Sequence, residues 1–218
     1  MRDSHDPSTP TDDGLTAGSA PGPISVKGQR TTGWVLFLAG IVGLLGAFSL
    51  AYEKFLVLDD PDHSISCDIN PVLSCGSVMA TPQASLFGFP NPLIGLMAFP
   101  FVIFTGVLFA SRVRLPRFVT LLFNLGTLGG MVFIGWLTVQ SIFVIEVLCP
   151  YCMVVWAATI PTFWFATVYS LRSGALPVGR NWRAAVDDVL KFHWVGLALL
   201  YLIPVALILM VFGDRLFA

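Results

Sequence analysis

The stretch SIFVIEVLCPYCMVVW, residues 141–156, joins two long apolar runs and places two cysteines at their junction. Uncharged residues extend on either side of it, over 118–145 and over 147–171. A helix needs roughly 20 apolar residues to cross the hydrocarbon core of a bilayer, and a charge near its centre is costly. Each run is therefore predicted to be a transmembrane helix, with Cys149 and Cys152 close to one membrane surface.

Composition extends this prediction to the whole chain. Hydrophobic residues make up 56% of the 218 residues and charged residues only 11%, and the mean hydropathy is +0.80. Three more uncharged runs occupy 31–52, 69–111 and 192–213. The first half of the second run is rich in Pro, Gly, Ser and Asn, so its span is placed at about 91–111. We therefore expect an all-α membrane protein with five transmembrane helices.

The charged residues indicate the orientation of the chain and argue against a nucleic-acid partner. The formal net charge is −1, and no basic stripe interleaved with aromatic residues is present. With a cytoplasmic N-terminus, only Lys54 and Arg215 of the twelve basic residues fall outside, which leaves ten inside. We expect a multi-pass protein of the cell inner (plasma) membrane, with all four cysteines on the extracytoplasmic side.

The spacing of Cys149 and Cys152 favours redox chemistry over a structural role. Pro150 suits the first turn of a helix, which predicts Cys149 as the N-cap and Cys152 as a first-turn residue on the same side. Unpaired N–H groups and the helix dipole stabilise a thiolate there, and C-x-x-C cysteines often have lowered pKa values. Such a thiolate takes part readily in disulfide exchange.

The other two cysteines lie in the acidic loop segment SISCDINPVLSCGSVM, residues 64–79. Asn70-Pro71 is interpreted as a helix start, which would place Cys75 on a short helix and Cys67 before it. This pair can close a disulfide, or either cysteine can reach the C-x-x-C motif. Two alternatives stay open: a non-catalytic membrane scaffold with structural disulfides, and a zinc-binding membrane protein, since four thiolates can surround the metal.

Electrons arriving at the C-x-x-C motif need an acceptor, and no haem, flavin or iron–sulfur motif is present. A lipid-soluble quinone requires only an apolar cavity between helices with one or two polar contacts. The segment FNLGTLGGMVFIGW, residues 123–136, has small residues that allow helices to approach closely. Trp156 follows Cys152 by one helical turn, on the same face.

At this point the sequence resembles the bacterial vitamin K epoxide reductase family, over roughly 34–171. The resemblance rests on CDINPVLSCGSVM at 67–79, FGFPNPLIG at 87–95, and CPYC followed by an aromatic residue at Trp156, in that order. The DsbB type of quinone-linked oxidase places its C-x-x-C before the wider pair, so the order of the motifs argues against that type.

This resemblance implies a four-helix bundle that holds a quinone of the menaquinone or ubiquinone type beneath the C-x-x-C. Cys67 would exchange with an extracytoplasmic thioredoxin-like (DsbA-type) protein, Cys75 would pass electrons to Cys149, and Cys152 would face the quinone. Some bacterial relatives carry a fused thioredoxin-like domain after a fifth span; none follows here, so a separate protein is expected. The implied role is disulfide-bond formation in exported proteins.

The resemblance also implies three quinone contacts. Asn91 and Thr81 match polar positions of the family, and Trp156 stands where many relatives have Tyr, although an indole can donate a hydrogen bond but not accept one. The expected parts are a disordered cytoplasmic tail at 1–31, the redox bundle at 32–171 with an extracytoplasmic loop at 53–90 acting as a lid, a cytoplasmic loop at 172–192, and a fifth transmembrane helix with a short outer tail at 193–218.

Overall fold

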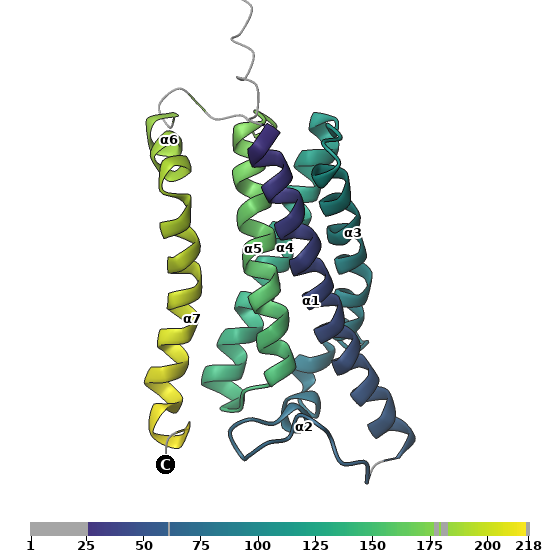
Figure 1. The fold of residues 1–218 in the computed structure, drawn as a ribbon. Helices are drawn as coiled ribbons and strands as arrows, with labels where there is room; N and C mark the ends of the chain where they lie inside the picture. The colour runs from purple at the N-terminus through teal and green to yellow at the C-terminus, as the bar shows by residue number, and fades with distance from the viewer. Residues whose placement is uncertain (1–25, 61, 177–178, 180–182, 217–218) are drawn as a thin grey trace, which may run out of the picture.

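A computed structural model describes residues 26–60, 62–176, 179 and 183–216. Figure 1 shows long, roughly parallel helices with a small helical loop at one end of the bundle. In chain order the elements are α1 (Val26–Asp59), α2 (Cys75–Met79), η1 (Pro82–Ser85), α3 (Pro92–Ala110), α4 (Arg117–Gln140), η2 (Ser141–Ile145), α5 (Pro150–Arg172), α6 (Arg183–Lys191) and α7 (His193–Leu216).

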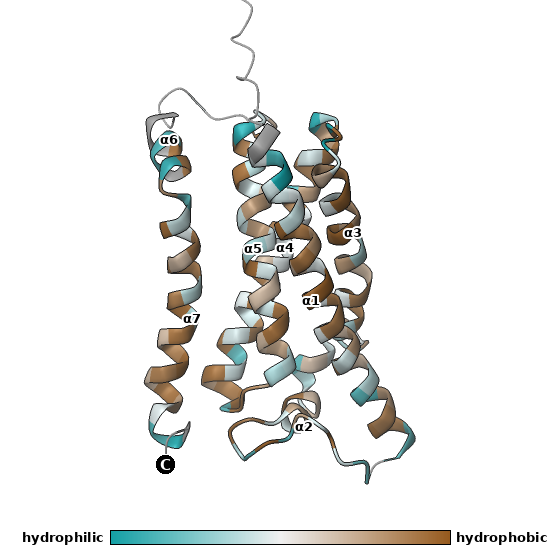
Figure 2. Ribbon diagram, viewed as in Figure 1, coloured by the Kyte–Doolittle hydropathy of each residue, from teal (hydrophilic) through white to brown (hydrophobic). Residues whose placement is uncertain are grey.

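Five of these segments are long and apolar enough to cross a membrane. Figure 2 shows their hydrophobic middles and their more hydrophilic ends. The five are Gly28–Asp59, Pro92–Ala110, Arg117–Ile145, Pro150–Arg172 and His193–Arg215. The predicted all-α membrane fold with five spans is confirmed.

Helix α1 is the centre of the bundle. It packs along α3 on one side and along α5 on the other, and α4 packs mainly against α5. The buried core includes Leu36, Phe99, Phe109 and Tyr169, and the rings of Phe109 and Tyr169 lie 4.1 Å apart between centroids. Helices α3 and α4 do not pack extensively against each other. The bundle is therefore tightly closed around α1 and looser between α3 and α4.

Two glycines bring α1 and α3 into backbone contact. A Cβ atom added to Gly33 would lie 2.2 Å from the backbone nitrogen of Ala110, and one added to Gly106 would lie 2.6 Å from that of Phe37. Small residues permit this close approach, which is a common basis of helix association in membranes. No larger side chain fits at either position unless the helices move apart.

The boundaries of three predicted parts differ in the structure. Helix α1 continues to Asp59, so the first residues assigned to the extracytoplasmic loop are helical. It also begins at Val26, so the end of the predicted tail is helical, while residues 1–25 lie outside the described residues. The predicted cytoplasmic loop at 172–192 contains the nine-residue helix α6. Charged residues at both ends of α1 end its apolar run without ending its helix.

The helix predicted at Asn70-Pro71 starts later. Asn70 Oδ1 accepts hydrogen bonds from the N–H groups of Val72, at 2.9 Å, and Leu73, at 2.8 Å, and so closes a turn. The following backbone pairs with another segment rather than continuing as a helix. Helix α2 then begins at Cys75, capped by Ser74.

The fifth span, α7, lies at the edge of the bundle and contacts the segment before the C-x-x-C motif. Phe212 is fully buried and packs with Ile142 and Leu148, the residue before Cys149. Near the same end, Arg215 forms an ion pair with Glu146 at 3.2 Å. Helix α7 therefore supports the segment that carries the first cysteine of the motif.

We expect Gly106→Val to destabilise the protein by about 1–3 kcal/mol, because the added side chain forces α1 and α3 apart. Gly129→Val is the matched control, since a Cβ atom at Gly129 meets nothing within 4 Å. Thermal loss of helicity in detergent, followed by circular dichroism, measures both. An equal midpoint for the two variants would contradict the close packing of α1 on α3.

Candidate redox site

A short backbone pairing brings the two cysteine pairs together. The N–H of Ser74 donates to the carbonyl of Leu148 at 3.0 Å, and the N–H of Leu148 donates to the carbonyl of Val72 at 2.8 Å. Cys149 directly follows Leu148, and Cys75 directly follows Ser74. The loop and the start of α5 are thereby held in a fixed register.

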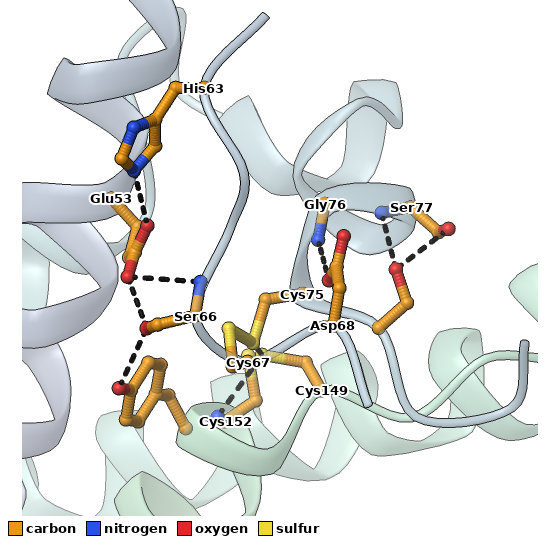
Figure 3. Close-up of a disulfide and its surroundings, with 12 residues drawn as sticks. Glu53, His63, Ser66, Cys67, Asp68, Cys75, Gly76, Ser77, Cys149 and Cys152 are labelled. Carbon is orange, nitrogen blue, oxygen red and sulfur yellow. Dashed lines mark hydrogen bonds and ion pairs between the residues drawn. A yellow bond between two sulfur atoms is a disulfide. The ribbon is translucent and has the colours of Figure 1, made fainter. Parts of the chain in front are cut away.

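The four cysteines cluster at this junction, as Figure 3 shows. Cys67 and Cys75 form a disulfide with their Cα atoms 5.7 Å apart, and Cys149 and Cys152 are free thiols. The Sγ of Cys149 lies 3.2 Å from the Sγ of Cys75. Disulfide exchange proceeds by attack of a thiolate on a disulfide sulfur, and this contact places the two atoms for that attack.

The start of α5 favours the thiolate form of Cys149. Cys149 is the N-cap of the helix, as predicted, and its Sγ accepts the N–H of Cys152 at 3.3 Å. A hydrogen bond from the Cys152 thiol lowers the pKa of Cys149 most, against the opposing effect of burial. The N–H groups of Cys152 and Tyr151 lower this pKa further, while the Asp68 carboxylate opposes them. The net result is a pKa below the ordinary value.

A buried carboxylate holds the segment before Cys67 against α1. Glu53 Oε1 accepts hydrogen bonds from both the N–H and the hydroxyl of Ser66, and Oε2 lies 3.4 Å from Nε2 of His63. The Ser66 hydroxyl is in turn 3.3 Å from the hydroxyl of Tyr151, inside the C-x-x-C motif. These contacts, drawn in Figure 3, connect α1, the loop and α5 beside the disulfide.

Two further hydrogen bonds fix the helix that carries Cys75. Asp68 Oδ1 accepts the N–H of Gly76 at 2.9 Å, and Ser74 Oγ accepts the N–H of Ser77 at 3.0 Å. Both satisfy N–H groups of the first turn of α2. Together with the disulfide they leave Cys67 and Cys75 almost inaccessible, with exposed fractions of 4% and 0%.

An apolar cavity of about 630 Å³ extends from the cysteines into the bundle, between α1, α3, α4 and α5. Cys149 and Cys152 line it, as do Trp156 and Asn91. The Asn91 amide also joins the ends of its own loop, donating to the Gln83 carbonyl at 2.7 Å and accepting from the Leu86 N–H at 3.2 Å. The cavity is lined mainly by hydrocarbon and reaches the sulfur atoms.

The structure places Thr81 away from the cavity wall. Its hydroxyl donates to the Val78 carbonyl at 2.7 Å, at the end of α2. The predicted contact between Thr81 and a quinone therefore stays a prediction. Within the described ranges no three His, Cys, Asp or Glu side chains converge as metal ligands, and zinc binding stays an alternative to be tested.

Several residues that shape the site were not identified from the sequence. Glu53 and Lys54 directly follow the first apolar run. The only local feature that marks them is the change from uncharged residues to an acid and a base. Asp68 and Ser66 flank Cys67, which is a weaker signal because loops are rich in such residues. The pairing of Leu73 with Leu148 has no signature in the sequence at all.

The fold and this site define a class: a membrane protein whose clustered cysteines are arranged for thiol–disulfide exchange. Comparison with protein families makes the assignment specific. Residues 34–167 match the Vitamin K epoxide reductase family, and the chain belongs to that family. A search of curated proteins found no match for the chain. The protein is thus a membrane thiol oxidoreductase, in agreement with the resemblance found in the sequence.

We expect the double variant Cys67→Ser, Cys152→Ser to form a stable disulfide between Cys75 and Cys149. Each substitution removes a thiol that would resolve this bond, one from the loop side and one from the helix side. Peptide mapping of the oxidised protein under non-reducing conditions detects the bond. Free Cys75 and Cys149 in a folded double variant would show that the two pairs do not exchange directly.

The lowered pKa of Cys149 predicts a pH dependence. Only the thiolate of Cys149 reacts with an alkylating agent. In a Cys67→Ala, Cys75→Ala background, alkylation should therefore continue at pH values below the ordinary cysteine pKa. Its rate should fall as the pH falls through the lowered pKa of Cys149. Adding Cys152→Ala removes the main stabilising hydrogen bond and should shift the midpoint to higher pH. Adding Cys152→Ser, which keeps a hydroxyl donor, should shift it less. Coincident midpoints in all three proteins would exclude Cys152 as the cause.

Proposed function

We propose that the protein oxidises a separate extracytoplasmic thioredoxin-like (DsbA-type) protein and passes the electrons to a quinone, so that it supports disulfide-bond formation in exported proteins. One observation carries this proposal. The four cysteines connect the loop to the cavity, with Cys149 3.2 Å from Cys75 and Cys152 on the cavity wall. A static staple needs no such free thiol beside its disulfide.

The sulfur chemistry balances in two transfers. A partner dithiol attacks Cys67 and breaks the Cys67–Cys75 bond, and the partner leaves as a disulfide. Cys75 then attacks Cys149 of an oxidised C-x-x-C, and Cys67 resolves the mixed disulfide, which restores the loop disulfide and releases two thiols at Cys149 and Cys152. The structure has the loop oxidised and these two thiols reduced, which is the state after that transfer.

The cavity fits a quinone in size and polarity. A volume of about 630 Å³ with mainly apolar walls is typical of small-molecule sites. Bound there, a quinone would accept two electrons and two protons as the disulfide between Cys149 and Cys152 forms. Asn91 and Trp156 would hold it through N–H donors, and the expected contact of Thr81 with the quinone stays a prediction.

A lateral opening supports exchange with the membrane. Phe104 on α3 and Leu122 on α4 line the cavity, and yet 62% and 57% of their surfaces are exposed. The cavity therefore reaches the lipid-facing surface where α3 and α4 pack loosely. An isoprenoid tail of the menaquinone or ubiquinone type would extend through this gap while the ring stays near Cys152.

The orientation follows from the charges at the two ends of the bundle. Arg112, Arg114, Arg117 and Arg172 lie at the end away from the cysteines, and the acidic residues Asp59, Asp60, Asp62 and Asp68 lie on the cysteine side. By the positive-inside rule, the basic end faces the cytoplasm. We therefore place the protein in the inner membrane with its cysteines on the extracytoplasmic side.

We expect Cys67→Ser and Cys152→Ser to fail in different ways. Without Cys67, exchange with a reduced DsbA-type protein should stop while a small dithiol still supports quinone reduction, because the inner pair and the cavity are intact. Without Cys152, quinone reduction should fall to background with either reductant. Quinol formation is followed by absorbance, with Ser64→Ala, an exposed loop change, as the control.

The alternatives predict other outcomes in the same assay. A non-catalytic scaffold would neither carry a quinone after purification nor oxidise the partner protein. A zinc protein would carry the metal stoichiometrically. If Cys67→Ser and Cys152→Ser lose the small-dithiol activity equally, electrons do not pass from the loop cysteines to the C-x-x-C in the proposed order.

A further inference from the structure

We propose that Lys54 is a direct contact of the quinone head group, donating a hydrogen bond to a ketone oxygen and stabilising the negative charge that develops there. This rests on the proposed function, since it names a residue of the same site. Its basis is the position of Lys54 on the cavity wall, its unused hydrogen-bond donors and the absence of a carboxylate partner among the described residues.

Lys54 lies on the face of α1 that is turned towards the cavity. Ala47, Leu50 and Lys54 follow one another at intervals of three and four residues, and all three line the cavity. Residues at this spacing share one face of a helix. Leu50 packs among Cys67, Cys75 and Cys149, so Lys54 lies one turn further along α1, towards the loop.

Lys54 is the one charged residue among those that line the cavity in the described part of the chain. A charge beside an apolar cavity is costly unless it has a partner. The neighbouring carboxylate, Glu53, is bonded to Ser66 and lies next to His63 instead. No ion pair of Lys54 with a carboxylate occurs within the described residues.

The ammonium group has donors to spare. Its Nζ donates to the Met79 carbonyl at 3.2 Å, at the C-terminal end of α2, which uses one of its three N–H bonds. This contact turns the side chain inward under the loop rather than outward to the membrane surface. The bond to α2 therefore occupies one N–H donor of Lys54, and two donors are left for a ligand.

Most other polar groups on the wall are already bonded to protein. The hydroxyls of Thr127, Thr138, Thr159 and Thr162 donate to carbonyls of their own helices. Asn91 has one N–H left after its bond to Gln83. Since Met79, Gln83 and Asn91 line the cavity together with Lys54, the loop end of the cavity is where a ketone oxygen finds donors.

The chemistry of reduction favours a cation at this point. The ketone oxygens of a quinone accept hydrogen bonds, and they gain negative charge as electrons arrive from the sulfur atoms. A fixed positive group aimed at the position where charge develops stabilises it more in an apolar site than in water. Lysine supplies such a compact charge with several donors.

Three variants test this assignment in detergent-solubilised full-length protein. Lys54→Met keeps the length and removes the charge, Lys54→Arg keeps the charge, and Lys191→Met makes the same change at an exposed lysine of α6. Equilibrium dialysis with a short-chain ubiquinone gives the dissociation constant. We expect Lys54→Met to raise it about tenfold or more, Lys54→Arg to restore most of the affinity, and Lys191→Met to leave it unchanged.

A second measurement separates binding from support of the loop. The rate at which a small phosphine reduces the Cys67–Cys75 disulfide reports on loop closure, and it should be the same in Lys54→Met and in the wild type. If Lys54→Met weakens quinone binding only to the extent that it speeds up reduction of the disulfide, the proposal is overturned. Lys54 would then act by capping α2 and not by contacting the quinone. Should Lys54→Met fold poorly, Lys54→Leu removes the charge and the donors in the same way.

The outcomes also distinguish this proposal from the proposed function. Unchanged quinone affinity in Lys54→Met, with the wild type binding well, would overturn the role of Lys54 and leave quinone reduction standing. If the wild type binds neither the short-chain ubiquinone nor a short-chain menaquinone, both proposals are overturned. A raised dissociation constant with an unchanged rate of disulfide reduction supports the contact.

Discussion

Two backbone hydrogen bonds to Leu148 hold the redox site together. They tie Val72 and Ser74 of the loop to the residue before Cys149, and the sulfur contact between Cys75 and Cys149 follows from that register. A side-chain contact could shift with a rotamer, but a backbone pairing fixes the chain direction of both partners. Phe212 of α7 packs on Leu148, so the fifth span contributes to the same constraint although it lies outside the bundle.

The loose packing of α3 on α4 is as important for the site as the tight packing of α1 on α3. Glycines bring α1 and α3 into contact and leave no room between them, while α3 and α4 separate around the cavity. The tight interface positions Leu50 and Lys54 of α1 under the loop. The open one gives the cavity its access to lipid. A bundle that packed uniformly would have a core in place of a site.

Local signals in the sequence predicted much of this architecture. The absence of charge over long runs located five spans, and Pro150 located Cys149 at the start of α5. Contacts between distant segments escaped prediction. Helix α1 continues beyond its apolar run to Asp59, and Ser66 and His63 from the loop contact its Glu53. The pairing of Leu73 with Leu148 joins residues far apart in the chain, and neither residue type indicates a partner.

Burial of the loop disulfide decides which thiols can react with it. In the proposed order of transfer the reductant attacks Cys67, yet this residue is 4% exposed and follows a segment held by Glu53. Small thiols dissolved in water, such as glutathione, find no surface to attack while that segment is closed. A protein that binds the segment can shift it as part of docking. In the function proposed above, the same packing that stabilises the loop would favour a protein donor over small thiols.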